Sequence, residues 1–263
     1  MKALIIAAGY ATRLYPLTQN FPKPLLEVGG KTILDRLVDQ VKTVPEIDAI
    51  CLVTNHRFRG HFQRWADNRM ASARQNVQAH TGVRLDILDD GTASNDDRLG
   101  AVGDIQFAIA AQNITDDLMV LAADNLLQFP LNDFVSAYRK NPSAHVCVRL
   151  IEDPEDRKRR GIALLDGDNR IVDFEEKPEQ PKSKWAVPPF YIYPSDILPR
   201  IKDYLDAGGI SDAPGHFLVW LHKHAPVYAY KIQGAIFDIG NHESLAEARS
   251  FFERDRARGT KDR

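Results

Sequence analysis

Cationic side chains follow closely on the first apolar run of the chain. Residues 3–8 (ALIIAA) lead into Gly9 and Arg13, and Lys23 stands ten residues later between two prolines. An arginine offers phosphate oxygens a planar fork of donors, and a lysine offers a compact charge. Small residues between the run and the cations let backbone N–H groups approach the same anion. The stretch therefore predicts a strand that leads into a phosphate-binding loop.

The loop differs from two well-known phosphate-binding fingerprints. Its pattern from Gly9 to Arg13, G-x-A-T-R, lacks the second and third glycines of the dinucleotide fingerprint G-x-G-x-x-G. No Gly-Lys-Ser/Thr follows, as it would in a Walker A loop. These five residues alone are equally compatible with an ordinary turn between a strand and a helix, so a longer pattern is needed.

Carboxylates end two later apolar runs. Asp124 closes the run DLMVLAAD, and Asp238 follows the apolar residues of AIFDIG. Either aspartate alone is compatible with an N-cap of a following helix. Together they offer the oxygen ligands that Mg²⁺ prefers, and phosphates and water would fill the other coordination positions. The pair makes a case for a divalent ion beside the phosphate-binding loop.

The longer N-terminal pattern resembles a known signature. GYATRLYPLT at residues 9–18, followed by PKPL at residues 22–25, is similar to the G-x-G-T-R-L-x-P-L-T…P-K-P motif of the sugar-phosphate nucleotidyltransferases. This family comprises the nucleoside-diphosphate-sugar pyrophosphorylases, including glucose-1-phosphate thymidylyl- and uridylyltransferases. Ala11 stands where the family usually has glycine, and Pro188-Pro189 replaces another usual glycine. Because alanine disfavours positive φ angles, we expect a tighter loop at Ala11.

The resemblance extends over nearly the whole chain and implies roles for individual residues. It implies catalytic roles for Arg13 and Lys23, metal ligation by Asp124 and Asp238, and acceptor binding by Glu176 and Lys177 of an E-K-P motif. It implies nucleotide contacts from Ala7, Ala8, Gly9, Thr12, Asp90, Gly100 and Asp124. Without the other motifs, Glu175-Glu176 would be interpreted as a solvated charge run.

The resemblance places the base of the nucleotide at residues 89–101. Relatives that use thymine or uracil often carry an amide early in this segment, whereas this chain has Asp89 and Asp90. A carboxylate only accepts hydrogen bonds, so it suits an exocyclic amino group better than a carbonyl. This difference points toward cytosine or guanine, although hydroxyl and amide side chains at residues 92–95 are alternative contacts.

The pattern of apolar residues predicts which elements position these side chains. We expect strands at residues 3–8, 49–54, 83–88, 117–124, 144–151, 162–165, 170–175, 186–193 and 227–232, and helices at 32–43, 58–73, 99–112, 195–206 and 243–258. The alternation in the first half predicts a mostly parallel sheet with helices on both faces. Ligands of such sheets bind at the carboxyl ends of the strands, where Gly9, Asn55, Asp89, Asp90 and Asp124 should converge.

We therefore expect an α/β fold, a Rossmann-like three-layer sandwich with a mixed, mostly parallel central sheet and a small β-rich acceptor-binding region. The expected organisation is one domain over residues 1–263. Its nucleotide-binding part is residues 1–143, its acceptor-binding part is residues 144–248, and residues 254–263 form a charged tail that frays.

Composition excludes several classes of protein. The chain has 263 residues, 44% of them hydrophobic, and a net charge of −2, so nothing attracts it to nucleic acid or an anionic membrane. We expect a cytoplasmic protein without a signal peptide or membrane span. Cys51 and Cys147 should be buried thiols. The sequence is also compatible with a homo-oligomer. The basic residues 157–160 are interpreted as a solvated loop, and His222 and His224 as strand residues without zinc.

The working hypothesis is a Mg²⁺-dependent nucleotidyltransferase that joins a nucleoside triphosphate and a sugar 1-phosphate, giving an NDP-sugar and pyrophosphate. Arg13 would neutralise pyrophosphate, and Lys23 would bridge phosphates near the reacting centre. Lys177 would hold the acceptor phosphate, and Glu176 would orient the acceptor. One alternative is a cytidylyltransferase for phosphocholine or an inositol phosphate. A catalytically silent nucleotide-sensing subunit is the other, but such a subunit is expected to lack Arg13, Lys23 or a metal-binding aspartate.

Overall fold

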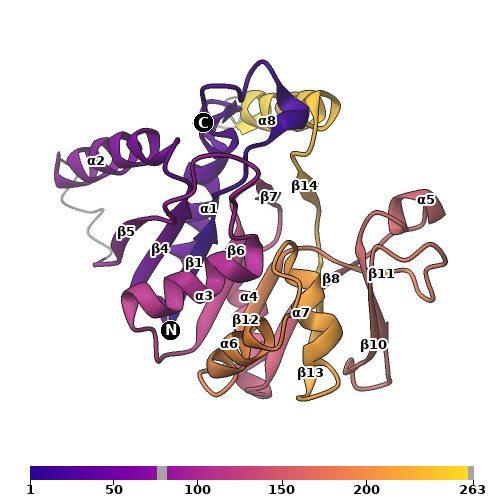
Figure 1. Cartoon of the computed structure of the whole chain (residues 1–263). Coiled ribbons are helices and arrows are strands. Elements are labelled where there is room, and N and C mark those ends of the chain that lie inside the picture. Colours follow the sequence, from indigo (N-terminus) through magenta and orange to yellow (C-terminus); the bar gives the residue numbers. More distant parts are fainter. Residues whose placement is uncertain (76–81, 260–263) are drawn as a thin grey trace.

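Ten strands in the described part of the chain form one sheet, and two short strand pairs lie outside it. The computed structural model describes residues 1–75 and 82–259 (Figure 1). The N-terminal half of the sheet is parallel and consists of β1 (Lys2–Ile6), β4 (Ala49–Thr54), β5 (Arg84–Asp89) and β6 (Leu118–Ala122). The other strands are β8 (Ala144–Leu150), β9 (Gly161–Leu165), β10 (Ile171–Glu176), β11 (Trp185–Val187), β12 (Phe190–Tyr193) and β13 (Val227–Lys231). The strand order is β10-β9-β11-β8-β12-β6-β1-β4-β5, and β13 pairs with β8.

Helices cover both faces of this sheet. One face carries α1 (Ile33–Val41), α2 (Arg59–Gln75) and α4 (Leu131–Lys140), and the other carries α3 (Ala101–Gln112), α6 (Leu198–Asp206) and α7 (Pro214–Leu221). The central strands β1 and β4 lie between the two helical layers, which explains their unbroken apolar runs. The predicted α/β class, a three-layer arrangement around a mixed sheet, is confirmed.

The first helix shows how local sequence sets an element. Apolar residues at 33, 34, 37, 38 and 41 form one buried face of α1. At its N-terminus, Thr32 Oγ1 accepts a hydrogen bond from the Asp35 backbone N–H (2.9 Å), and the Asp35 carboxylate accepts one from the Thr32 N–H (3.3 Å). This capping box begins the helix directly after the short hairpin β2 (Glu27–Val28) and β3 (Lys31–Thr32).

The second half differs from several of the expectations. His222 and His224 follow the helix α7 instead of lying on a strand, so that prediction is wrong. The apolar run at residues 217–221 forms a helix because Pro214 occupies its first turn and neighbouring elements bury it. The strand expected at 186–193 is two strands, since β11 and β12 pair with different neighbours on either side of Pro188-Pro189.

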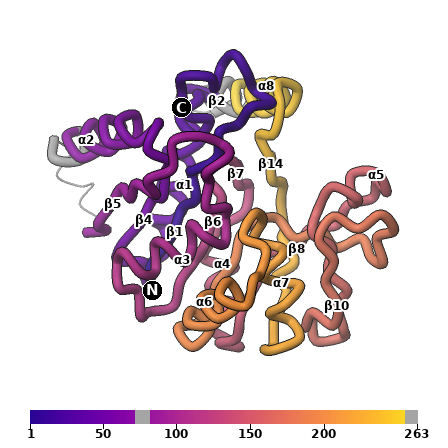
Figure 2. Tube along the Cα trace, in the orientation of Figure 1, coloured from indigo at the N-terminus to yellow at the C-terminus, as the bar shows by residue number. Residues whose placement is uncertain are grey.

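The C-terminal segment returns to the N-terminal loop. Strand β14 (Ile236–Asp238) pairs with β7 (Asn125–Leu127), and α8 (His242–Gly259) contacts β2. Figure 2 shows this yellow helix beside the indigo N-terminal segment. A separate apolar cluster fixes the contact, with Leu14, Val28, Ile33, Leu245 and Phe252 among its members. The division into nucleotide and acceptor parts stays a prediction. The fraying tail predicted at residues 254–263 is wrong for residues 254–259, which belong to α8, and residues 260–263 lie outside the described residues.

Two further expectations concern the whole chain. In the described ranges no helix combines the length and the apolar character that crossing a membrane requires. Both cysteines, Cys51 and Cys147, are buried and unpaired thiols, as expected.

Candidate active site

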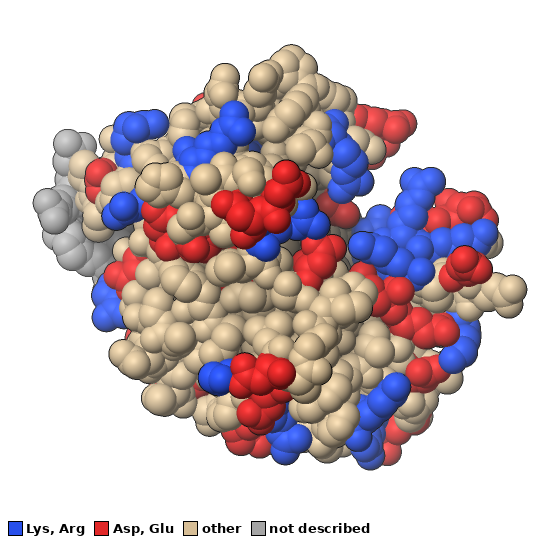
Figure 3. Space-filling view, in the orientation of Figure 1, with Lys and Arg blue, Asp and Glu red and all other residues tan. Residues whose placement is uncertain are grey.

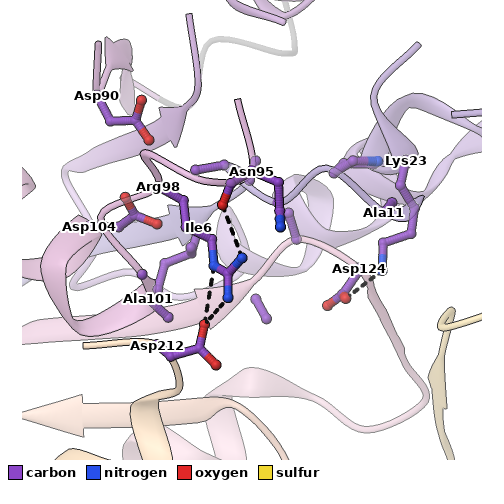
Figure 4. A pocket seen from close by; sticks show the side chains of 17 residues that line it. Ile6, Ala11, Lys23, Asp90, Asn95, Arg98, Ala101, Asp104, Asp124 and Asp212 are labelled. Atoms are coloured by element: carbon purple, nitrogen blue, oxygen red, sulfur yellow. Dashed lines mark hydrogen bonds and ion pairs between the residues drawn. The ribbon is translucent and has the colours of Figure 1, made fainter. Parts of the chain in front are cut away.

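A cavity of about 300 Å³ opens at the carboxyl ends of β1, β5 and β6 (Figure 4). Its lining includes the predicted nucleotide-binding residues Ala7, Ala8, Gly9, Asp90, Gly100 and Asp124, together with Lys23. Asn55 lies behind the loop, fully buried, where its amide Nδ2 donates to the Ala8 carbonyl (2.9 Å). The structure thus brings Gly9, Asp90 and Asp124 together at one cavity, as the parallel sheet predicts. Thr12 and Arg13 follow in the next turn, the short helix η1 (Thr12–Leu14), and do not line the cavity.

Ala11 gives the loop its turn. Its φ is +47° and its ψ is +44°, the left-handed conformation that a glycine would adopt easily. An alanine pays on the order of 1 kcal/mol for this conformation. The Ala11 carbonyl accepts hydrogen bonds from the Leu14 N–H (3.0 Å) and from the buried Thr18 hydroxyl (2.7 Å), which hold the turn. The chain therefore keeps a glycine-type turn, and Thr18 is a supporting residue that our sequence reasoning did not identify.

Lys23 connects the loop with the two strands that carry aspartates. The side chain is 13% exposed, and its Nζ lies 2.6 Å from Asp124 Oδ2 and donates to the Ile239 carbonyl at 2.8 Å. Burial alone would raise the pKa of Asp124, but the Lys23 ammonium outweighs it and the pKa is lowered. Asp124 is therefore held as a carboxylate at the end of β6.

Asp238 reaches the same place from β14. The pairing of β14 with β7 puts Asp238 opposite Asn125, and the Ile239 N–H donates to the Asp124 carbonyl (3.0 Å). Burial raises the pKa of Asp238, and the negative charge of Asp124 raises it further. Among the described residues, no three His, Cys, Asp or Glu side chains form a group that could hold a metal ion. Two neighbouring carboxylates instead fit Mg²⁺, which commonly completes its coordination with substrate phosphates and water.

Arg13 lies against the same motif. A Cβ placed on Gly240 would be 3.6 Å from Arg13 Nη2, so the guanidinium covers this glycine. The charge of Arg13 lowers the pKa of Asp238. This effect is weaker than that of burial, which raises the same pKa. The guanidinium is exposed and forms no hydrogen bond or close ion pair with any described residue. It is therefore free to bind an anion that enters from the loop side.

A second cavity, of about 160 Å³, lies next to the first and contains the predicted acceptor residue Glu176. Asn125 and Asp238 line it too, so it adjoins the site of Lys23 and Asp124. The Glu176 side chain is only 10% exposed, and burial raises its pKa. A Cβ on Gly215 would overlap the Glu176 carboxylate, so this glycine makes room for it.

Lys177 lies at the edge of this region. Its φ is +49°, its side chain is 57% exposed, and its Nζ is 3.9 Å from Glu176 Oε1. The Lys177 backbone N–H donates to the Arg160 carbonyl at 3.0 Å. The side chain lines neither of the two cavities, so its assignment to the acceptor phosphate stays a prediction.

Three arginines that our sequence reasoning did not assign to a site line this second cavity. Arg149, Arg159 and Arg160 all contribute to it, and Arg160 Nη1 lies 3.6 Å from Asp238 Oδ2. Figure 3 shows Lys and Arg side chains over the lobe of α5 (Pro154–Arg157), beside a hollow of the surface. The interpretation of residues 157–160 as a solvated loop is therefore wrong for Arg160, which is half-buried and contacts Asp238, whereas Arg159 is exposed at the edge of the cavity. The register of the β9–β10 hairpin, which pairs Gly161 with Glu176, brings Arg160 to this position.

Asp89 and Asp90 have different surroundings. Asp89 contacts His56 Nδ1 at 2.7 Å and does not line the cavity. Asp90 lines it, and its Oδ1 accepts hydrogen bonds from the Thr92 N–H and the Thr92 hydroxyl, both at 2.7 Å. A further carboxylate, Asp104 of α3, lines the same end of the cavity and is 4% exposed. Sequence reasoning missed Asp104, because it appears as an ordinary polar residue inside a predicted helix.

The N-terminus of α3 is occupied by another part of the chain. The Ala101 and Val102 N–H groups donate to the carbonyls of Asp212 (3.1 Å) and Ser211 (2.9 Å). Gly100 has a φ of +79°, and a Cβ there would collide with the Ser211 carbonyl. Arg98 donates to Asp212 Oδ1 through Nη2 at 2.9 Å. Gly100 therefore shapes the cavity wall, and the end of α3 is not an open anion site.

The fold and this site define a nucleotide-dependent transferase, and comparisons with known proteins agree. The chain belongs to the nucleotidyl transferase family, whose family model matches residues 2–255. It is 27% identical over 256 residues to the bifunctional protein GlmU of Methanocaldococcus jannaschii. That alignment covers 95% of this chain and 54% of the relative, so the chain spans about half the length of that protein.

Solved structures share the fold. A UDP-glucose pyrophosphorylase complexed with UDP-glucose superposes with a TM-score of 0.79 at 21% identity, covering 97% of this chain and 98% of the other. A UTP-bound UGPase from Acinetobacter baumannii gives a TM-score of 0.76 at 20% identity, covering 95% and 92%. At this level of identity the likeness establishes the fold and leaves the substrates open.

Proposed function

We propose that this nucleotidyltransferase joins a nucleoside triphosphate and a sugar 1-phosphate in a Mg²⁺-dependent reaction that yields an NDP-sugar and pyrophosphate. The contact of Lys23 with Asp124, at the junction of the two cavities, carries this proposal. One cavity is open to a nucleotide and the other to an acceptor, so the α-phosphorus of the nucleotide would lie where they meet. Relatives named for UDP-glucose and UTP support the same reaction class.

The reaction needs no covalent bond to the protein. An oxygen of the acceptor phosphate attacks the α-phosphorus, a new P–O bond forms, and the bond to the leaving pyrophosphate breaks in line. The protein contributes by positioning the two anions and by stabilising charge. A divalent ion held by Asp124 and Asp238 would supply positive charge at the α-phosphate. Lys23 donates to phosphate oxygens at the same point, and the free guanidinium of Arg13 neutralises the departing pyrophosphate.

The second cavity favours an anionic, hydroxylated acceptor. The buried Glu176 carboxylate can accept hydrogen bonds from hydroxyl groups of a sugar. Arg149 and Arg160 can bind the acceptor phosphate, and they would share this role with Lys177. The same arginines disfavour phosphocholine, because its quaternary ammonium would lie among like charges. An inositol phosphate, which is anionic and hydroxylated, stays as the alternative acceptor that an acceptor screen must include.

The experiment that tests this proposal is pyrophosphate release with Mg²⁺, crossing ATP, GTP, CTP, UTP and dTTP with sugar 1-phosphates, inositol phosphates and phosphocholine. We expect one preferred pair that includes a sugar 1-phosphate and loses its activity when EDTA removes the metal. Silence over the whole panel, from folded protein that binds a triphosphate, would overturn the proposal and favour the sensing subunit.

A further inference from the structure

Two carboxylates occupy the end of the nucleotide cavity that lies away from the phosphate-binding cations. Figure 4 shows Asp90 and Asp104 together at one end and Lys23 with Asp124 at the other. If the proposed function holds, the triphosphate lies at the cationic end. The base then lies at the end where Asp90 and Asp104 converge.

Each of these carboxylates has one buried oxygen without a hydrogen-bond partner in the described part of the chain. These atoms are Asp90 Oδ2 and Asp104 Oδ1. Asp90 Oδ1 is already satisfied by Thr92, so the free oxygen of Asp90 is the one available to a ligand. Burial raises the pKa of Asp104 to about 7, and the charge of the adjacent Asp90 and a hydrogen bond between the two carboxyl groups contribute to this rise. Above this pH both carboxyls are ionised, the proton between them is lost, and both oxygens need donors. Buried acceptors of this kind are costly unless a ligand supplies donors.

We infer that Asp90 and Asp104 make this site selective for a base with an exocyclic amino group, so that cytosine, guanine or adenine is accepted and uracil and thymine are disfavoured. An amino group has two N–H donors, one for each free carboxylate oxygen. The corresponding position of uracil or thymine is a carbonyl oxygen, which would face two acceptors. The inference rests on the proposed function for the orientation of the nucleotide, and it separates this chain from the UDP-glucose and UTP relatives above.

The test is kcat/KM for pyrophosphate release with each of the five triphosphates at pH 8, where Asp104 carries its charge. Binding of each triphosphate is measured in parallel by calorimetry. We expect one amino-bearing base to exceed UTP and dTTP by at least ~100-fold in both measurements, because the site rejects a base that leaves its buried polar groups unpaired. Equal use of all five, or a preference for UTP or dTTP, would overturn the inference and leave the proposed function intact.

Variants separate the role of the pair from its effect on folding. Asp90→Asn and Asp104→Asn each keep the shape and replace an acceptor oxygen with an amide, so we expect the ratio of UTP to the preferred base to rise at least ~10-fold. Asp89→Asn is the matched control, since Asp89 pairs with His56 outside the cavity and should leave the ratio unchanged. Unchanged ratios in both cavity variants, with melting temperatures no lower than the parent's, would also overturn the inference. Selective binding of an amino-bearing triphosphate without pyrophosphate release would sustain it while the proposed function failed.

Discussion

Lys23 Nζ and Asp124 Oδ2 lie 2.6 Å apart, although 101 positions separate the two residues in the sequence. The lysine comes from the loop after β1 and the aspartate from the end of β6, and β1 and β6 are neighbouring parallel strands. Ile239 completes the contact, because its carbonyl accepts a second hydrogen bond from Lys23. One ammonium thus joins the three segments whose motifs resemble the family signature, at the place where we propose that a phosphate binds.

Lys23→Ala should lower kcat/KM for pyrophosphate release by at least ~100-fold, because it removes a charge aimed at the reacting phosphates. The variant should still fold at reduced stability, since the side chain contributes no apolar packing to the core clusters and Asp124 can take up a proton when its partner is lost. Lys31→Ala is the control, because Lys31 forms an exposed ion pair with Asp39 and should change activity little. Retained turnover in Lys23→Ala would remove Lys23 from the mechanism.

Asp238→Asn should raise the Mg²⁺ concentration needed for half-maximal activity by ~10-fold or more, because it replaces one of two charged oxygen ligands with a neutral amide. Titration of activity with Mg²⁺ at saturating nucleotide measures this shift. Glu243→Gln, on the first turn of α8, is a control that removes a carboxylate from the C-terminal segment without touching the proposed ligands. An unchanged Mg²⁺ dependence would show that Asp238 is not a ligand.

Much of the fold could be predicted from the sequence because strong local signals agree with it. The apolar runs of β1, β4 and β6 are buried on both faces, and a capping box begins α1, so alternation alone indicates the layered sheet. The α7 segment could not be assigned in this way. Its run FLVWL is apolar throughout, and periodicity cannot distinguish a fully buried helix from a buried strand.

The candidate site was predictable where motifs mark strand ends, as at Gly9, Asp124 and Asp238. The positions of Asp104 and Arg160 at the cavities could not be predicted, because they depend on tertiary structure. Asp104 faces the cavity only because the 211–212 loop fixes the start of α3. Arg160 lines the second cavity because the hairpin register places Gly161 opposite Glu176. No pattern in a single sequence contains either relationship.

Arg160→Ala should raise the KM for the acceptor by ~10-fold, which corresponds to about 1.4 kcal/mol, and leave the KM for the triphosphate nearly unchanged. The reason is that Arg160 lines the acceptor cavity and lies apart from the nucleotide cavity. Steady-state kinetics with each substrate varied in turn measures both constants. Lys158→Ala provides the matched control, since its side chain pairs with Glu155 and lines neither cavity. A rise in the triphosphate KM alone would contradict the assignment.

The titration of Asp104 should make the folded state less stable as pH rises. Burial raises its pKa to about 7 from an ordinary value of 3.8, so the folded state binds this proton more tightly than the unfolded chain does. The stabilisation is complete below about pH 4 and is lost as pH approaches 7, with a slope of at most ~1.4 kcal/mol per pH unit. Asp104→Asn cannot titrate, so it should reduce this decline and be more stable than the parent at pH 8.

Urea unfolding of the parent and of Asp104→Asn at pH 5 and pH 8 measures the effect, because the difference between the two proteins isolates this carboxyl from all other titrations. Asp86→Asn is the control, an aspartate of β5 that forms an ion pair with Arg84. Parallel losses of stability in the parent and in Asp104→Asn would mean that Asp104 is already ionised in the folded protein at low pH. The end of the cavity that we propose for the base would then carry the Asp104 charge at pH 5 as well as at pH 8, and the titration of Asp104 would add no pH dependence to its selectivity among the triphosphates.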